Sequence, residues 1–168
     1  MTKNIVEIAR SYLGQMEKHN NSGFVDGIFE KKMQNVGFYK SAPWCGFFCR
    51  LIWTEAGLSI THMLNKRKRT IVTSSAVKSM KAASECGRWS ATPEIGSVAV
   101  WRTFKKGVPQ STGHMAVVIG VNADSFQTIE GNTNANGGRE GNTVAEKLRS
   151  YSWYREDGLR LMGFISIK

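Results

Sequence analysis

The strongest helical pattern in the chain is WCGFFCRLIWTEAG, residues 44–57. Its apolar residues recur at helical spacing and form a face wide enough to be buried on most sides. Pro43 cannot continue a helix backwards, so the helix is predicted to begin at Trp44 or Cys45, and Gly57 is predicted to end it. The segment therefore predicts a buried central helix with Cys45 at its N-terminus.

The rest of the chain divides into helical patterns followed by strand patterns. Further helices are predicted over residues 2–14, 25–35 and 74–83, with Thr2 and either Ser74 or Ser75 as N-caps. From Pro93 onward short strands are predicted between turn residues, over 97–102, 114–121, 125–130, 143–149 and 161–167. Helices followed by a run of strands indicate an α+β fold with a mainly antiparallel sheet.

Length and composition are typical of one globular domain. The 168 residues are 41% hydrophobic and 21% charged, without an internal repeat or linker, so we expect a single domain over residues 1–168. No apolar run approaches the roughly 20 residues that a membrane-spanning helix needs. The N-terminus does not have the pattern of a secretory signal. We therefore expect synthesis in the cytoplasm, and any work outside the cell requires a holin, a virion or a secretion system.

The chain is strongly basic, with a net charge of +10 that is most concentrated at residues 66–69, KRKR. Such a charge favours an anionic partner, and a bacterial wall or outer surface is the preferred interpretation. Aromatic residues are not interleaved with the basic run, which disfavours nucleic acid. A solvated basic face that only keeps the protein soluble remains open.

The three cysteines are an odd set without CxxC spacing, so neither a disulfide framework nor a zinc knuckle is indicated. Cys45 and Cys49 would lie one helical turn apart, which leaves open a metal site that includes His114. Such a site needs a further ligand, and no spacing indicates one. We therefore expect no metal and no cofactor, with Cys49 and Cys86 as small buried hydrophobic residues.

Cys45 is the candidate nucleophile. A cysteine attacks as its thiolate, and unpaired N–H groups at a helix N-terminus favour that anion, as does a nearby imidazolium. The backbone N–H of Cys45 would point toward the oxygen of a bound carbonyl and serve as one donor of an oxyanion hole. A merely packed thiol in an apolar helix is the alternative.

His114 and Glu130 are the candidate base and the candidate residue that orients it. His114 follows Gly113 at the start of a predicted buried strand, and Glu130 ends the next strand. In a hairpin the start of one strand lies beside the end of the other, so the two side chains are predicted to meet. A carboxylate there fixes the imidazole tautomer, so that the other ring nitrogen faces Cys45. Asn132 is left open as an orienting or substrate-binding residue, while a satisfied strand histidine and a surface acid are the alternative interpretations.

With these residues in place, the chain resembles CHAP domains, the cysteine, histidine-dependent amidohydrolases and peptidases of the papain-like, NlpC-type fold. The resemblance covers nearly the whole chain and is carried by 43–45 (PWC), 93–96 (PEIG), 113–114 (GH), 129–134 (IEGNTN) and 138–141 (GREG). Phage endolysins and related wall hydrolases carry similar strings. It implies N-terminal helices packed on an antiparallel sheet of five to six strands.

The resemblance also implies an activity: cleavage of an amide bond in peptidoglycan through a thioester. The bond would be either the N-acetylmuramoyl–L-alanine link or a peptide link in the stem or cross-bridge. Cys45 would be the nucleophile, His114 the base and Glu130 the orienting residue, and Asn132 matches a position that lines family active sites. Trp44 either lies at the cleft edge, against sugar or peptide, or is a core aromatic residue.

Some members of the family bind calcium through an aspartate-rich loop before the cysteine. Residues 35–43 contain no acidic residue, so we expect no calcium site. We also expect no separate wall-binding domain, and the basic surface is a candidate substitute for one. Oligomeric state is not readable from the sequence, and a monomer is the default expectation.

Two other functions remain open at this point. The same three residues would serve a toxin-type cysteine peptidase or deamidase that acts on a protein. In a different class, an inert module would use the basic face to bind wall polymers. All three candidate catalytic positions are filled, which argues against the inert module.

Overall fold

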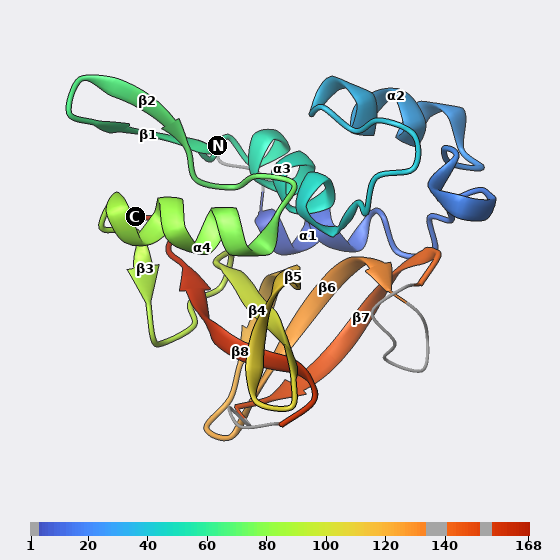
Figure 1. Cartoon of the computed structure of the whole chain (residues 1–168). Helices are drawn as coiled ribbons and strands as arrows, with labels where there is room; N and C mark the ends of the chain where they lie inside the picture. Colours follow the sequence, from blue (N-terminus) through green and yellow to red (C-terminus); the bar gives the residue numbers. More distant parts are fainter. Residues whose placement is uncertain (1–3, 134–140, 152–155) are drawn as a thin grey trace.

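The computed structural model describes residues 4–133, 141–151 and 156–168, and Figure 1 shows its elements. Its helices are α1 (Ile5–Arg10), the 3-10 turn η1 (His19–Asn21), α2 (Gly27–Asn35), α3 (Cys45–Glu55) and α4 (Ala76–Glu85). Its strands are β1 (Thr61–Leu64), β2 (Arg67–Thr70), β3 (Trp89–Ser90), β4 (Val98–Lys105), β5 (Val108–Val121), β6 (Ser125–Thr133), β7 (Thr143–Ser150) and β8 (Gly158–Ile165).

The strands after α4 form one antiparallel sheet in the order β3-β8-β4-β5-β6-β7. The helices lie together above this sheet, with α3 and α4 packed against it (Figure 1). The predicted α+β class with an antiparallel sheet of five to six strands is confirmed.

Helix α3 lies at the centre of the core, as its apolar pattern predicts. Cys45 is its first residue, Trp44 is its N-cap, and Gly57 follows its end with a φ of +75°. Most of its residues are buried, and it packs on β5 and β6. The indole N–H of Trp53 donates to the carbonyl oxygen of Gly96 at 2.9 Å, which joins the helix to the turn before β4. The position of Cys45 is therefore fixed by the core.

The sheet has a second apolar face besides the one covered by the helices. Ala99, Trp101, Ala116, Val118, Phe126, Leu161 and Phe164 form a separate buried cluster there. Along β6, Thr128 and Glu130 continue the alternation that begins with Phe126, while Ile129 belongs to the core under the helices. Glu130 therefore lies at the end of a buried row of side chains.

Several predicted boundaries need correction. Helix α1 is shorter than predicted, and Asn4 caps it by accepting a hydrogen bond from the Val6 N–H; the predicted cap, Thr2, lies outside the described residues. The second helix begins at Gly27 with Asp26 as its cap. Of the two candidates for the cap of α4, Ser75 is the residue that accepts the Lys78 N–H. Strand β5 begins six residues before the predicted start at His114, because its first half extends a hairpin with β4.

The basic run lies in a hairpin that was not predicted. Strands β1 and β2 form a two-stranded sheet of their own, and the run occupies its turn and β2, whose residues are all exposed. The hairpin projects from the body of the molecule beside α4 (Figure 1). No helix within the described ranges is long and apolar enough to cross a membrane.

Candidate active site

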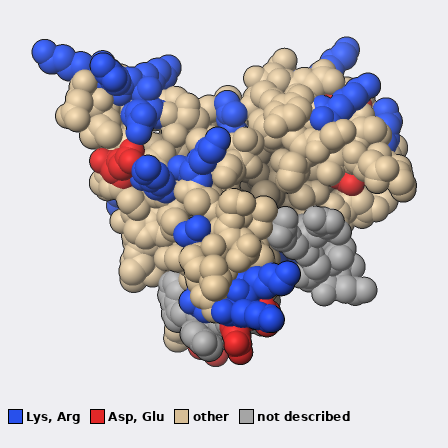
Figure 2. Space-filling model, viewed as in Figure 1, with Lys and Arg blue, Asp and Glu red and all other residues tan. Residues whose placement is uncertain are grey.

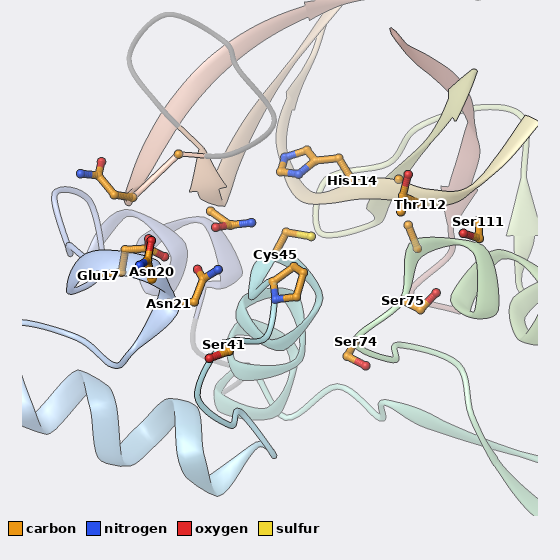
Figure 3. Close-up of a pocket in the computed structure, with 16 residues that line it drawn as sticks. Glu17, Asn20, Asn21, Ser41, Cys45, Ser74, Ser75, Ser111, Thr112 and His114 are labelled. Carbon is orange, nitrogen blue, oxygen red and sulfur yellow. The ribbon is translucent and has the colours of Figure 1, made fainter. Parts of the chain in front are cut away.

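A cleft of about 870 Å³ opens at the N-terminus of α3. Figure 3 shows Cys45 near its middle with His114 beside it. Its lining comes from the loops before α2 and α3, the first residue of α3, the start of α4, the middle of β5, the end of β6 and the residues before β7. The lining residues are Glu17, Asn20, Asn21, Ser41, Pro43, Cys45, Ser74, Ser75, Ala76, Ser111, Thr112, Gly113, His114, Asn132, Gly141 and Asn142.

Cys45 is the first residue of α3, so its backbone N–H has no carbonyl partner one turn earlier in the helix. The side chain is only 5% exposed. Burial raises the pKa of the thiol, but His114 outweighs this by its hydrogen bond and charge. With further help from the N–H groups of Met115 and Gly46, the pKa of Cys45 falls below its ordinary value. The site therefore favours the thiolate.

Glycine at position 46 allows a neighbouring loop to approach the start of α3. A Cβ atom there would lie 2.4 Å from the carbonyl oxygen of Thr73 and 3.0 Å from the carbonyl carbon of Ser74. A larger residue would therefore push the loop before α4 away from Cys45. This contact was not predicted, because the loop and the helix lie far apart in the chain.

His114 is buried between Cys45, Glu130 and Trp101. Its Nε2 lies 2.9 Å from Oε2 of Glu130, and its ring centroid lies 5.8 Å from that of Trp101. Within the described ranges, the Nδ1 atom makes no hydrogen bond of ordinary geometry, and it is the ring nitrogen left for Cys45. Burial lowers the pKa of His114, but the interactions with Cys45 and Glu130 outweigh it and raise the pKa to about 9. The ring therefore carries its proton through the neutral pH range.

Glu130 is fully buried and accepts hydrogen bonds on both oxygens. Besides His114, the Thr128 hydroxyl donates to Oε1 at 2.7 Å, and Arg149 donates from Nε to Oε1 at 2.7 Å and from Nη2 to Oε2 at 2.6 Å. Burial opposes the charge, but His114 and then Arg149 hold the pKa of the Glu130 carboxyl well below its usual range. Glu130 is thus a fixed anion beside the imidazole. Arg149 and Thr128 were not predicted.

Trp101 also belongs to this arrangement and was missed by the sequence analysis. Its ring contacts His114 on β5, and the guanidinium of Arg149 lies 5.3 Å from the centroid of the same ring. It is 6% exposed, so it covers the buried ion group with an apolar surface. In the sequence it is one apolar residue of a strand pattern, and nothing there marks its role.

Two placements were left open for Trp44, and in the structure it lies in the core. Its side chain is 0% exposed and packs edge-on against Phe24, with Phe29 and Phe48 nearby. Its indole N–H donates to a carboxylate oxygen of Glu17. The placement at the cleft edge against substrate is therefore wrong, because a buried ring cannot reach a ligand.

Asn132 lies in the cleft lining, two residues beyond Glu130. It is 7% exposed and has a φ of +56°, a conformation that asparagine tolerates better than most residues. The structure brings it to the site but gives the contact with His114 Nε2 to Glu130. Of the two candidates for orienting the ring, Glu130 is therefore the one within hydrogen-bond distance of it.

Cys49 and Cys86 are buried free thiols, in agreement with the expectation for them. Burial, followed by the charge of Cys45, raises the pKa of Cys49 well above its ordinary value. No group of three or more His, Cys, Asp or Glu side chains suited to a metal occurs in the described part of the chain. The neighbouring motif residues 134 and 138–140 lie outside the described residues.

The comparison with protein families finds one match. A family model described as CHAP domain matches residues 37–132, which is more than half of the chain and includes Cys45, His114, Glu130 and Asn132. Neither a curated protein nor a solved structure matches the chain.

Proposed function

The chain belongs to the CHAP domain family, and from this membership we propose that it is a cysteine-dependent hydrolase that cleaves an amide bond of bacterial peptidoglycan. The observation that supports the reaction is the arrangement in one cleft of the Cys45 thiol at a helix N-terminus, the His114 ring and the buried Glu130 carboxylate. A nucleophile, a base and a group that orients the base are what acyl transfer by cysteine requires.

The resting site is proposed to be an ion pair of thiolate and imidazolium. The lowered pKa of Cys45 and the raised pKa of His114 both favour this state at neutral pH. Because Glu130 occupies Nε2, the proton on Nδ1 is the one available for transfer. The site thus holds a nucleophile and an acid before substrate arrives.

In the first half-reaction the Cys45 sulfur attacks the amide carbonyl carbon. The negative charge that forms on the carbonyl oxygen is stabilised by the Cys45 backbone N–H at the start of α3. His114 gives its Nδ1 proton to the leaving nitrogen, the carbon–nitrogen bond breaks, and an amine departs. The acyl group remains on sulfur as a thioester.

In the second half-reaction water replaces the amine. His114, now neutral, takes a proton from the water molecule, which attacks the thioester carbonyl carbon. The carbon–sulfur bond breaks, the product leaves with a carboxyl group, and thiolate and imidazolium are restored. Throughout both steps Glu130 holds the ring in place and balances its positive charge.

The basic hairpin formed by β1 and β2 is proposed to bind anionic polymers of the wall or envelope. Its cations extend into solvent at one corner of the molecule (Figure 2). Arg69 is paired with Glu85 at 2.7 Å, but β2 carries further cations on an exposed surface. We propose action at the wall or in the periplasm after delivery by a holin, a virion or a secretion system.

The deciding experiment is digestion of purified sacculi, followed by mass spectrometry of the newly released ends. We expect new amino and carboxyl ends with the wild-type protein and none with Cys45→Ala. Cys86→Ala is the matched control, because it removes a thiol at the end of α4, away from the cleft. Undiminished release by Cys45→Ala would overturn the proposal.

The same digest separates the competing functions. A free muramoyl carboxyl group would identify an amidase, and a peptide end would identify an endopeptidase. Binding to sacculi without release of any end would indicate an inert wall-binding module. Absence of both binding and release, with cleavage or deamidation of a protein, would favour the toxin-type enzyme.

A further inference from the structure

The two ends of the cleft differ in chemistry. Figure 3 shows Glu17 and Asn21 on one side of Cys45, and Ser75 and Thr112 on the other. A substrate chain that places a carbonyl group at the Cys45 sulfur would therefore extend toward an acidic end and toward a neutral, hydroxyl-rich end.

Glu17 gives the first end its charge. Among the described residues that line the cleft, it is the only one with a carboxylate, and none is a lysine or an arginine. The nearest cation in sequence, Lys18, lies 3.5 Å from Glu30 instead. Among the described residues, no cation pairs with Glu17, which leaves its charge to a ligand in the cleft.

The Glu17 carboxylate is also held in place. The buried indole N–H of Trp44 donates to its Oε2, and the Glu17 backbone N–H donates to the carbonyl oxygen of Asn142 at 2.7 Å. No hydrogen bond to its Oε1 occurs within the described ranges. Trp44 needs only a neutral acceptor, so this bond does not by itself explain why the residue is an acid.

Asn21 supplies an independent observation. Its side-chain Oδ1 is buried and has no hydrogen-bond partner in the part of the chain that the structure describes. Its backbone is held by the bond from the Ser41 N–H to its carbonyl oxygen, at 2.9 Å, and by a φ of +53°. A buried carbonyl oxygen without a donor costs free energy, and a turn of the Asn21 side chain into the cleft that it lines would let a ligand supply the donor.

We propose that Glu17 and Asn21 form a subsite for a free primary ammonium group of the substrate. One carboxylate oxygen and one amide oxygen, both without a donor among the described residues, match a group that has only N–H donors and a positive charge. This inference rests on the proposed function and names its substrate class: a wall peptide with an unblocked amine, either on a diamino-acid side chain or at a peptide N-terminus.

The test compares sacculi whose amines have been changed in two ways. Acetylation removes the charge, whereas reductive dimethylation adds comparable bulk and keeps it. We expect acetylation to lower the wild-type rate of end release roughly ten- to hundredfold, the range of a hydrogen-bonded charge pair, and dimethylation to lower it far less. Acetylation at mildly acidic pH blocks α-amines before side-chain amines, so a third sample identifies which amine is bound.

Glu17→Gln keeps an acceptor for Trp44 and removes the charge. We expect this variant to melt like the wild type, to cleave untreated sacculi slowly and to be insensitive to acetylation. Glu7→Gln, which removes an exposed carboxylate from α1, should keep the wild-type sensitivity.

The outcomes separate the two proposals. Equal wild-type rates on untreated and acetylated sacculi would refute the ammonium subsite and leave the hydrolase intact. An acetylation effect that persists at full size in Glu17→Gln would also refute it. Failure of the wild type to open any amide bond in untreated sacculi would refute the proposed function, and the substrate class with it.

Discussion

Arg149 on β7 holds Glu130 on β6 through two parallel hydrogen bonds, one to each carboxylate oxygen, at 2.7 and 2.6 Å. The carboxylate has no exposed surface, while the Arg149 side chain is 23% exposed. A planar guanidinium matches a carboxylate in this geometry, and a lysine ammonium does not. The orientation of His114 therefore depends on a residue that does not touch it through a hydrogen bond.

Replacing Arg149 should impair both stability and turnover. Arg149→Gln leaves a buried anion without its cation, and we expect it to unfold several degrees below the wild type and to lose most of its activity. Arg149→Lys keeps the charge but loses the paired hydrogen bonds of the guanidinium. Its activity should therefore lie between those of the wild type and Arg149→Gln. Thermal melts and sacculus digestion measure these effects. Wild-type activity in Arg149→Gln would show that His114 is oriented without it.

The thiolate of Cys45 should be visible in its reaction with iodoacetamide. The pKa of Cys45 is lowered, so alkylation should reach its maximum at a lower pH than for an ordinary cysteine, and it should fall as still lower pH protonates the sulfur. Peptide mapping by mass spectrometry separates Cys45 from the other thiols. The pKa of buried Cys49 is raised, so it should stay unlabelled in the folded protein. Alkylation of Cys45 that rises only above pH 8.5 would contradict the ion pair.

The fall in activity at high pH should follow the loss of the proton from the His114 ring. Its pKa is raised to about 9, so the imidazolium that protonates the leaving amine is present below that pH and is lost above it. Glu130→Gln removes the anion that helps raise this pKa, and the fall in activity should move to lower pH. A pH profile of kcat/KM measures both variants. If the high-pH fall in kcat/KM is unchanged in Glu130→Gln, that fall reflects the titration of a group other than His114.

The sequence predicted the meeting of His114 and Glu130 because local rules determine it. A short turn joins their strands, so the start of one strand must lie beside the end of the other. Cys45 was placed as reliably, since Pro43 leaves the helix little choice of starting point. These predictions needed only neighbouring residues and hairpin geometry.

Arg149 could not be predicted in the same way. It lies opposite Phe126 in the β6–β7 register and reaches Glu130 along the same face of the sheet. Its role therefore depends on the register of β7 against β6, and the alternation of β7 alone does not reveal that register. Trp44 was ambiguous for a related reason, because the aromatic residues that bury it come from a distant loop and α2.

The hairpin of β1 and β2 was missed because its sequence contradicts the usual strand pattern. Strand β2 is a charged run without alternation, and its turn residues, Asn65 and Lys66, both have positive φ. That is the geometry of a tight two-residue hairpin turn, in which glycine commonly follows asparagine. With lysine in that place, the turn signal is weak.

Gly131 should be intolerant of a side chain. A Cβ atom there would lie 2.5 Å from Cζ3 of Trp44 and 2.8 Å from Cβ of Phe48, so β6 would have to move away from α3. We expect Gly131→Ala to cost about 1–3 kcal/mol of unfolding free energy. Activity should also fall, because α3 carries the Cys45 sulfur and β6 carries the Glu130 carboxylate. Gly27→Ala is the control, since its Cβ would meet open space at the start of α2. Denaturant unfolding measures both, and equal stabilities would show that the contact relaxes easily.

Reversing charges on the hairpin should weaken binding to the wall without changing the chemistry. Arg67 and Lys68 are exposed on β2, so the double variant Arg67→Glu and Lys68→Glu should fold normally. We expect its binding to sacculi at low salt to fall about tenfold or more and to depend less on salt than wild-type binding. Its rate on short soluble wall fragments should not change, because the hairpin contributes no residue to the cleft. A double variant of Lys31 and Lys105, exposed cations elsewhere, makes the same change in net charge and should retain tighter binding. If both double variants lose binding equally, net charge alone attracts the protein to the wall, and the hairpin is not a docking surface.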